Sequence, residues 1–273
     1  MNKGVCMYRK TIVALGCALL IGCSYIQKGR IAIPAYREGD IERAVETLGT
    51  RQTNLENFKA RVTFIIDSPD LEKQQKFRGN VAVEMPDRLR LVSTGAFGRK
   101  LFDLVSVGKS FLLHFPSEQK VFFEKEGMPV ESLPFSVSPS DIVKELFGPE
   151  DWGNVDLANV RVLSPGGRRL VVALYSGGVL KRKLWIQRPE WLLVRDELYA
   201  EDGTLRAVTV LDRYRRIQET WMPTRFEAQY PLHETYMVMN LGRIEINTGL
   251  NPRLFVFPEK LLLMAQRQRE QEG

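Results

Sequence analysis

The strongest constraint on the fold is a succession of segments in which apolar and polar residues alternate. The first, FKARVTFII, begins at Phe58, and the next, KFRGNVAVEM, begins at Lys76. A period of two is that of a half-buried β-strand. The turns between successive segments are short, and short connections join antiparallel neighbours. The sequence therefore predicts an antiparallel meander with one polar face and one apolar face.

The alternation continues through most of the chain. Further segments are RLRLVS, LFDLVSVG, SFLLHF, KVFFEK, RRLVVALY, LKRKLWIQ, EWLLVRDELY, TLRAVTVLDRYR, TWMPTRFEAQY and TYMVMNLGRIEIN. The predicted fold is mainly β (α+β): a strongly curved antiparallel half-barrel of about 11–12 strands, with helices on its concave face. Whether the first and last strands pair, and so close the sheet, stays open at this stage.

Helices are predicted at three places. Apolar residues recur at helical spacing from Ile41 to Leu48, behind Asp40 as a candidate N-cap. The segment SVSPSDIVKELFGPE has a capping serine, a proline at the first helical position and a Gly-Pro stop. We expect it to form a lid helix whose apolar stripe consists of Ile142, Val143, Leu146 and Phe147. A short C-terminal helix is expected after LFVFP.

The first residues have the pattern of an export signal. Arg9 and Lys10 precede an apolar run over residues 11–22, which is shorter than the roughly 20 residues that span a bilayer. The run closes on Leu-Ile-Gly-Cys, ending at Cys23, and this is similar to the lipobox of bacterial lipoproteins. The similarity implies cleavage before Cys23, which would then carry covalent N-terminal acyl and diacylglycerol groups. No other cofactor is expected.

This interpretation divides the chain into four parts. They are a lipoprotein signal peptide at residues 1–22, a lipidated N-terminus and tether at 23–39, the half-barrel domain at 40–258, and a C-terminal helix or tail at 259–273.

Two points stay open: whether translation starts at Met1 or Met7, and the alternative that Cys23 is an ordinary residue of an uncleaved anchor. Ser24 is not the aspartate that tends to retain enteric lipoproteins in the inner membrane. By its resemblance to enteric lipoproteins without that aspartate, the chain is expected at the periplasmic face of the outer membrane.

Cysteine usage and charge exclude several classes of protein. All three cysteines lie within the first 23 residues, so only the acylated Cys23 would remain, with no thiol for a disulfide or a zinc site. The formal charge of +6 falls to +3 when the three basic residues of the signal are removed. Such a mild, dispersed excess argues against a nucleic-acid binder.

The segment PDRLRLVSTGAFGRKLFDLVSVGKSFLLHFPSEQKVFF, residues 86–123, carries a family resemblance. Its Arg-rich strand, G-x-x-G turn and following strands resemble the LolB pattern within the LolA/LolB-like lipoprotein carriers, a superfamily that also includes the sensor RseB. Gly95, Gly98 and Gly108 match the turn positions. The resemblance implies an incomplete barrel whose hydrophobic cavity shelters acyl chains, and a periplasmic LolA-like donor as a partner.

The resemblance also implies an exposed leucine on a protruding loop. Leu71 is the nearest candidate by position, and the alternative is a half-buried leucine in a solvated hairpin.

The residues favour binding over catalysis. His114 and His233 stand alone, and neither G-x-S-x-G nor H-E-x-x-H occurs. We therefore expect no enzyme, no catalytic residues and no metal site. Candidates for a cavity wall are the large apolar side chains of Phe64, Val83, Leu91, Phe111, Leu113, Phe123, Leu184, Leu193 and Phe226.

For any one of these residues the alternative is ordinary core packing. As a set they exceed what a few short helices can cover, so a cavity for lipid or lipoprotein acyl chains is expected. The sequence predicts a monomeric, outer-membrane-anchored lipoprotein that takes part in lipoprotein or lipid transfer. The alternatives are a non-catalytic envelope sensor or protein-interaction lipoprotein with the same fold, and a structural lipoprotein with a filled core.

Overall fold

The computed structural model describes residues 37–272 apart from residues 70, 126–151, 153–154 and 165–166. All of them belong to one compact unit, Ala35–Gly273. The signal, Cys23 and the lid helix with Ile142, Val143, Leu146 and Phe147 lie outside the described residues.

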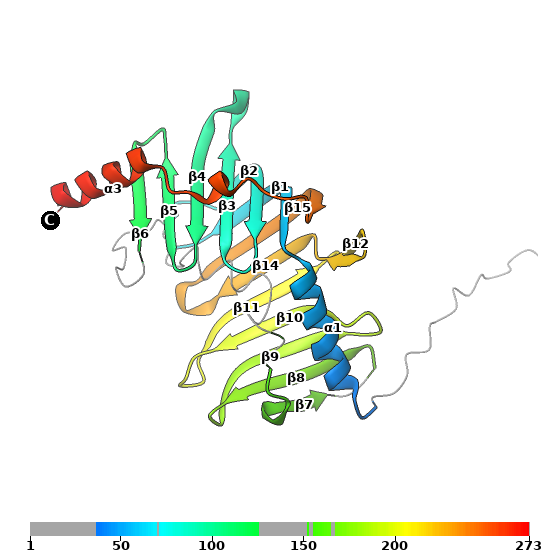
Figure 1. The fold of residues 1–273 in the computed structure, drawn as a ribbon. Helices are drawn as coiled ribbons and strands as arrows, with labels where there is room; N and C mark the ends of the chain where they lie inside the picture. The colour runs from blue at the N-terminus through cyan, green and yellow to red at the C-terminus, as the bar shows by residue number, and fades with distance from the viewer. Residues whose placement is uncertain (1–36, 70, 126–151, 153–154, 165–166, 273) are drawn as a thin grey trace, which may run out of the picture. The chain divides into compact units, whose positions relative to one another are not determined.

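Most of the described chain is β-structure (Figure 1). Thirteen strands form one antiparallel sheet in the order β6-β5-β4-β3-β2-β1-β15-β14-β11-β10-β9-β8-β7, and β12 and β13 form a separate ribbon. The strands are β1 Asn57–Asp67, β2 Gln75–Glu84, β3 Arg88–Thr94, β4 Lys100–Val107, β5 Ser110–Phe115, β6 Lys120–Glu124, β7 Val160–Ser164, β8 Arg169–Ser176, β9 Val179–Gln187, β10 Leu192–Tyr199, β11 Leu205–Asp212, β12 Arg215–Ile217, β13 Thr220–Met222, β14 Arg225–Tyr230 and β15 Thr235–Ile246. The helices are α1 Asp40–Asn54 and α3 Glu259–Glu272, with 3-10 turns η1 Ala96–Gly98, η3 Leu157–Asn159, η4 Pro231–His233 and η5 Pro252–Phe255.

The pair β1·β15 lies near the middle of the sheet and joins two series of hairpins. One series runs from β1 to the edge strand β6, and the other runs from β15 to the edge strand β7. Since β6 and β7 do not pair, the curved sheet is open and is not a closed barrel. The predicted fold class, a mainly β antiparallel half-barrel, is confirmed.

The strand count exceeds the prediction for three reasons. The short strand β7 was not predicted, because NVRVLS offers few alternating positions. The segment TLRAVTVLDRYR, predicted as one strand, leaves β11 at Asp212, and a separate strand, β12, begins at Arg215. The segment TWMPTRFEAQY, also predicted as one strand, divides at Pro223 into β13 and β14. Proline has no N–H to donate to a strand ladder.

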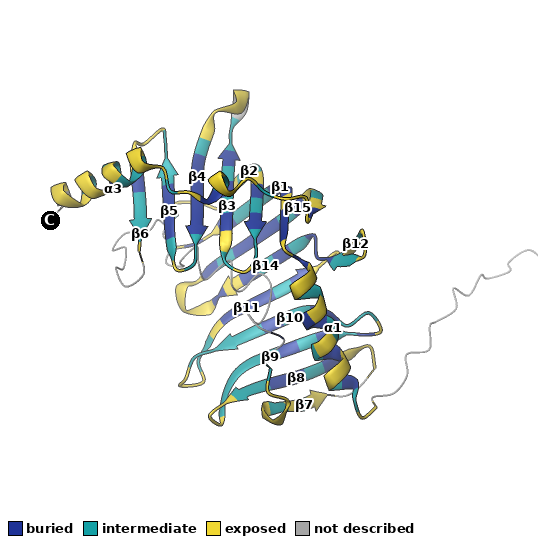
Figure 2. Ribbon diagram, in the orientation of Figure 1, coloured by how far each residue is buried: buried dark blue, intermediate teal, exposed yellow. Residues whose placement is uncertain are grey.

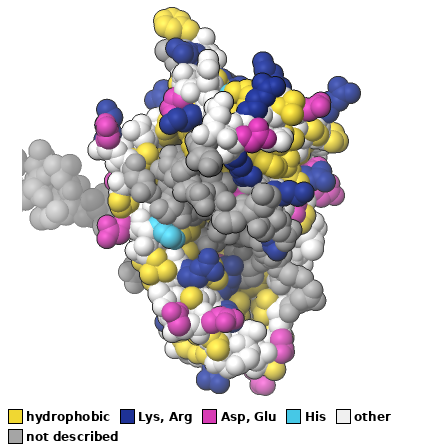
Figure 3. All heavy atoms as spheres, turned by 90° about the vertical axis from the view of Figure 1, so that its left-hand side faces the viewer, with side chains coloured by type: hydrophobic (Ala, Val, Ile, Leu, Met, Phe, Trp, Pro, Cys, Tyr) yellow, Lys and Arg dark blue, Asp and Glu magenta, His cyan; other side chains and the backbone are white. Residues whose placement is uncertain are grey.

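Alternation gives the sheet two distinct faces. The inner face carries Phe58, Val62 and Phe64 of β1, and the register continues it through Val83 of β2 and Met239 of β15. The largest hydrophobic cluster lies on this face, and Figure 2 shows the buried residues in the middle stretches of the strands. The outer face is the opposite one. Charged side chains of both signs are interspersed with apolar ones on the molecular surface (Figure 3).

Helix α1 packs on the inner-face cluster through Ala44 and Leu48. Its N-cap is Gly39, whose φ of 89° is left-handed, and not Asp40 as predicted. Asp40 instead lies in the first turn, where it is buried and its carboxylate forms an ion pair with Arg188 at 3.0 Å. The cap prediction was wrong because this carboxylate pairs with a distant arginine.

Helix α3 packs on the outer face, whereas the sequence placed the helices on the concave face. Its Ala265 joins Leu112 of β5 and Val121 of β6, which point away from their inward neighbours. The side chain of Gln268 accepts from the Val121 N–H at 3.1 Å and donates to the Gln119 carbonyl at 2.9 Å. The helix thereby covers the free backbone groups of the edge strand β6.

Candidate functional site

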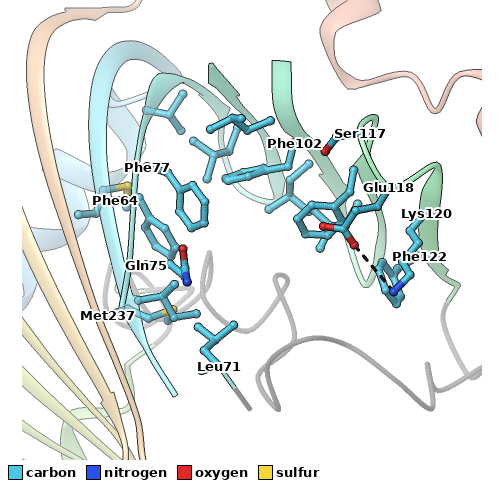
Figure 4. Close-up of a pocket in the computed structure, with 18 of the residues that line it drawn as sticks. Phe64, Leu71, Gln75, Phe77, Phe102, Ser117, Glu118, Lys120, Phe122 and Met237 are labelled. Atoms are coloured by element: carbon cyan, nitrogen blue, oxygen red, sulfur yellow. Dashed lines mark ion pairs between the residues drawn. The ribbon is translucent and has the colours of Figure 1, made fainter. Parts of the chain in front are cut away.

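A cavity of about 450 Å³ lies against the inner face of β1–β6 and β15. Its walls are mostly apolar, and Figure 4 shows the side chains of Phe64, Phe77 and Phe102 pointing into it. The period of two produces this wall, since every second residue of these strands faces inward. Among the described residues, α1 packs against the inner face elsewhere, on the core near β13.

Four phenylalanines form a row across one side of the cavity. The ring centroids of Phe77 and Phe102 are 5.1 Å apart with the rings nearly perpendicular, and Phe102 and Phe115 are 6.1 Å apart. Phe115 and Phe122 continue the row at 6.1 Å. Edge-to-face aromatic pairs gain about 0.5–1.5 kcal/mol each beyond their burial. The row therefore stiffens the wall across β2, β4, β5 and β6.

Polar groups occur at one end of the cavity. Gln75 lies at the start of β2, and Ser117, Glu118 and Lys120 come from the β5–β6 turn and the start of β6. Lys120 Nζ lies 3.8 Å from Glu118 Oε2 (Figure 4). More than half of each side chain is exposed. An exposed pair of this kind contributes little stability. The site thus combines an apolar interior with a polar, solvent-facing rim, which suits an amphiphilic ligand.

The predicted cavity residues divide between this wall and the core. Phe64, Leu91 and Leu113 line the cavity. Leu193 lines a smaller hollow of about 80 Å³ beside α1. The remaining inward residues are buried in the inner-face cluster, namely Val83, Phe111, Leu184 and Phe226.

The assignment of Phe123 to the cavity was wrong. Phe123 packs on the outer face against Phe257, with ring centroids 5.5 Å apart. The segment VFFEK has two adjacent phenylalanines, and alternation can turn only one of them inward. The register pairs Phe122 with Leu113, so Phe122 is the cavity residue.

Leu71 is half-buried and lines the cavity (Figure 4), so it is not the tip of a protruding loop. An exposed apolar tip is Phe97, a fully exposed residue in the β3–β4 turn between Gly95 and Gly98. In Figure 3 this hairpin tip, at the top of the view, carries an apolar group beside a basic one. Sequence reasoning missed Phe97. The available signal was a lone aromatic residue within a glycine-bounded turn.

The tip and the polar rim lie at the same end of the strands. Antiparallel pairing places the end of β3, the start of β2 and the end of β5 at one end of the sheet. The β3–β4 turn with Phe97 and the β5–β6 turn with Glu118 therefore both lie at this end of the sheet.

One charged pair is buried on the inner face outside the cavity wall. Asp196 of β10 accepts from Arg182 of β9, and burial raises the pKa of Asp196 to about 6 although Arg182 acts in the opposite direction. Across the part of the chain that the structure describes, no group of three or more His, Cys, Asp or Glu residues could hold a metal ion. No helix in that part is long and apolar enough to cross a membrane.

Solved structures with similar folds come from several bacteria. A DUF1329 family protein from Desulfovibrio piger superposes with a TM-score of 0.56 at 12% identity, covering 79% of this chain and 97% of its own. A LolA superfamily protein from Nitrosomonas europaea gives 0.53 at 15% identity, with coverages of 79% and 97%. A domain described as an outer membrane lipoprotein-sorting protein, from Vibrio parahaemolyticus, gives 0.52 at 13%, with coverages of 82% and 99%.

No protein-family model matches the chain, and no curated protein matches it by sequence. At these identities the structural likeness concerns the fold. The open antiparallel sheet with its inner-face cavity is a LolA/LolB-like fold.

Proposed function

We propose that this chain is a non-catalytic carrier that holds the acyl chains of a lipoprotein or another lipid in the inner-face cavity. The observation that carries the proposal is the cavity of about 450 Å³, apolar within and polar only at its rim. Its volume lies within the roughly 300–1,000 Å³ of ordinary ligand pockets. The likeness of the fold to a LolA superfamily protein and to an outer membrane lipoprotein-sorting domain supports the same interpretation.

The cavity suits acyl chains because apolar burial needs no exact polar partner. Each buried methylene gains about 0.8 kcal/mol, so affinity should rise with chain length until the cavity is full. A peptide or head group would remain at the rim beside Gln75, Ser117, Glu118 and Lys120.

The proposed location follows from the N-terminal sequence. Acylation of Cys23 would anchor the chain to the periplasmic face of the outer membrane, and a LolA-like periplasmic protein would deliver the cargo. More than one acyl chain is needed for stable anchoring, which the lipobox pattern provides.

Phe97 is proposed to touch the membrane during release of cargo. An exposed aromatic ring on a tight turn can enter the interfacial layer of a bilayer, where aromatic side chains are favoured. We expect Phe97→Ser to slow transfer of a bound acyl probe to vesicles while leaving probe affinity and the melting temperature unchanged. Equal transfer rates for the two proteins would remove Phe97 from the mechanism.

A direct test uses the chain expressed in the periplasm with a cleavable secretion signal in place of residues 1–23. The purified protein is extracted with organic solvent, and released lipids are identified by mass spectrometry. One acylated molecule per protein supports the carrier function and gives the cargo class. A lipid-free protein that also fails to bind fatty acids would refute it.

A further inference from the structure

A second hollow lies on the outer face and is separate from the acyl cavity. It has a volume of about 630 Å³ and is lined mainly by outer-face residues of β1, β2, β3 and β15 and by Leu254, together with Ala60 and Val81, whose side chains belong to the inner face. Leu254 belongs to the C-terminal arm, residues 247–258, which crosses this part of the sheet in Figure 1. Arg90 of β3 donates to the Leu254 carbonyl at 3.2 Å and so fixes the arm as one wall of this outer-face groove.

The floor of the outer-face groove is made of small or short side chains. The register aligns Lys59 of β1 with Ala82 of β2 and Arg90 of β3, and it aligns Arg61 with Asn80. Ala82 leaves open space between two long basic residues, and Asn80 presents an amide beside Arg61. The groove is therefore shaped by short residues on β2 between longer ones on its neighbours.

A β-bulge brings a further arginine to this groove. Lys59 pairs with Glu245 and Arg61 pairs with Gly242, so β15 has one residue more than β1 over this interval. Within it Arg243 has a φ of 50°, a left-handed conformation that is uncommon for a residue with a side chain. Bulges of this kind redirect a side chain. Here the redirected residue, Arg243, lines the groove beside Arg61.

Two of the four basic side chains in the groove form ion pairs with carboxylates, and two do not. Lys59 is paired with Glu245 at 2.9 Å, and Arg90 is paired with Asp103 at 2.8 Å. The side chains of Arg61 and Arg243 have no ion-pair or hydrogen-bonding partner among the described residues. Two guanidinium groups that line one groove repel each other unless an anion lies between them.

We propose that the outer-face groove binds a phosphoryl group through Arg61 and Arg243, with the Asn80 amide as a further donor. Two guanidinium forks and an amide offer more N–H groups than a two-oxygen carboxylate can accept, whereas a phosphoryl group presents additional acceptor oxygens. Arginine is the residue whose planar fork matches phosphate geometry best. The inference is independent of the acyl cavity.

The test is calorimetric titration of the full-length chain in a maltoside detergent and a phosphate-free buffer of low ionic strength. The probes are inorganic phosphate, glycerophosphoglycerol (the deacylated head group of phosphatidylglycerol) and acetate. We expect Arg61→Gln and Arg243→Gln each to weaken phosphoryl binding about tenfold or more, the usual effect of losing a charged hydrogen bond. Arg78→Gln, an exposed arginine of β2 that does not line the groove, should leave binding within about twofold.

The three probes and the variants together separate a lipid head group, a soluble phosphate and the absence of a phosphoryl site. Binding of glycerophosphoglycerol with the expected variant pattern supports the site and points to a lipid head group. Binding of inorganic phosphate alone supports the site and points to a soluble phosphate. The proposal is overturned if neither probe binds, if acetate binds more tightly than both, or if Arg78→Gln has the same effect as Arg61→Gln. All three arginines are exposed, so unchanged melting temperatures should show that the variants fold.

Discussion

Asp196 gives a quantitative test of the packing on the inner face. Its side chain is 3% exposed, and burial raises its pKa from the ordinary value of 3.8 to about 6. The guanidinium of Arg182 lowers the pKa, but this effect is smaller than that of burial. Unfolding exposes the carboxyl to water and returns the pKa to its ordinary value.

The sign of the pH dependence follows because burial outweighs Arg182 in setting the pKa of Asp196. The folded-state pKa of Asp196 exceeds the unfolded one, so folding favours the protonated form. The corresponding stability is fully present below about pH 4 and is lost as the pH rises through about 6. The difference between the two pKa values corresponds to about 3 kcal/mol, of which about 2 kcal/mol is lost between pH 4.5 and 7.5.

The assay is urea unfolding of the wild-type protein and Asp196→Asn at pH 4.5 and 7.5. Asparagine has nearly the same shape but cannot ionise, so contributions from other titrating groups cancel in the comparison. We expect the free energy of unfolding of the variant to rise relative to that of the wild type by about 2 kcal/mol over this interval. A constant difference would show that Arg182 fully offsets the effect of burial on the carboxylate, and a change in the opposite direction would show that Arg182 outweighs burial.

Two further substitutions test the backbone and the packing of α1. A Cβ on Gly79 would lie 2.0 Å from the Val92 carbonyl oxygen, so Gly79→Ala should lower the free energy of unfolding by about 3 kcal/mol or more. Gly242→Ala, where the added Cβ has no atom within 4 Å, is the control, and equal urea midpoints would contradict the close approach. Arg188→Met removes the ion-pair partner of the buried Asp40 carboxylate, which then accepts, among the described residues, only from the Arg37 N–H, and should cost about 3–5 kcal/mol. A calorimetric melting temperature like that of the wild type would mean that this ion pair is not buried in solution.

Local patterns in the sequence predicted the strands of this fold well, because each hairpin is specified by its own residues. Alternation from Phe58 to Ile66 places every second side chain of this segment, beginning with Phe58, on the inner face, as the register shows. The order of the strands across the sheet was beyond such reasoning. Pairing of β1 with β15 joins residues about 180 positions apart, and no local pattern near Phe64 specifies Met239 as its partner.

The cavity was predictable as a surplus of inward apolar residues, but its boundary was not. Phe64 and Phe226 have the same pattern in the sequence, yet one lines the cavity and the other is fully packed. The difference depends on which stretch of the sheet α1 covers. The Phe122–Phe123 doublet is ambiguous for another reason, since period two cannot assign a face when both residues are apolar.

The most direct test of the central claim is titration of a fluorescent fatty acid into the periplasmic form of the protein, with one variant that fills the cavity. Leu91→Trp places a larger side chain on the cavity wall, and Leu163→Trp changes an exposed leucine on β7 as the control. We expect one probe molecule to bind per protein, with affinity reduced about tenfold or more by Leu91→Trp and unchanged by Leu163→Trp. If Leu91→Trp binds the probe as tightly as the wild type, acyl chains do not occupy this cavity.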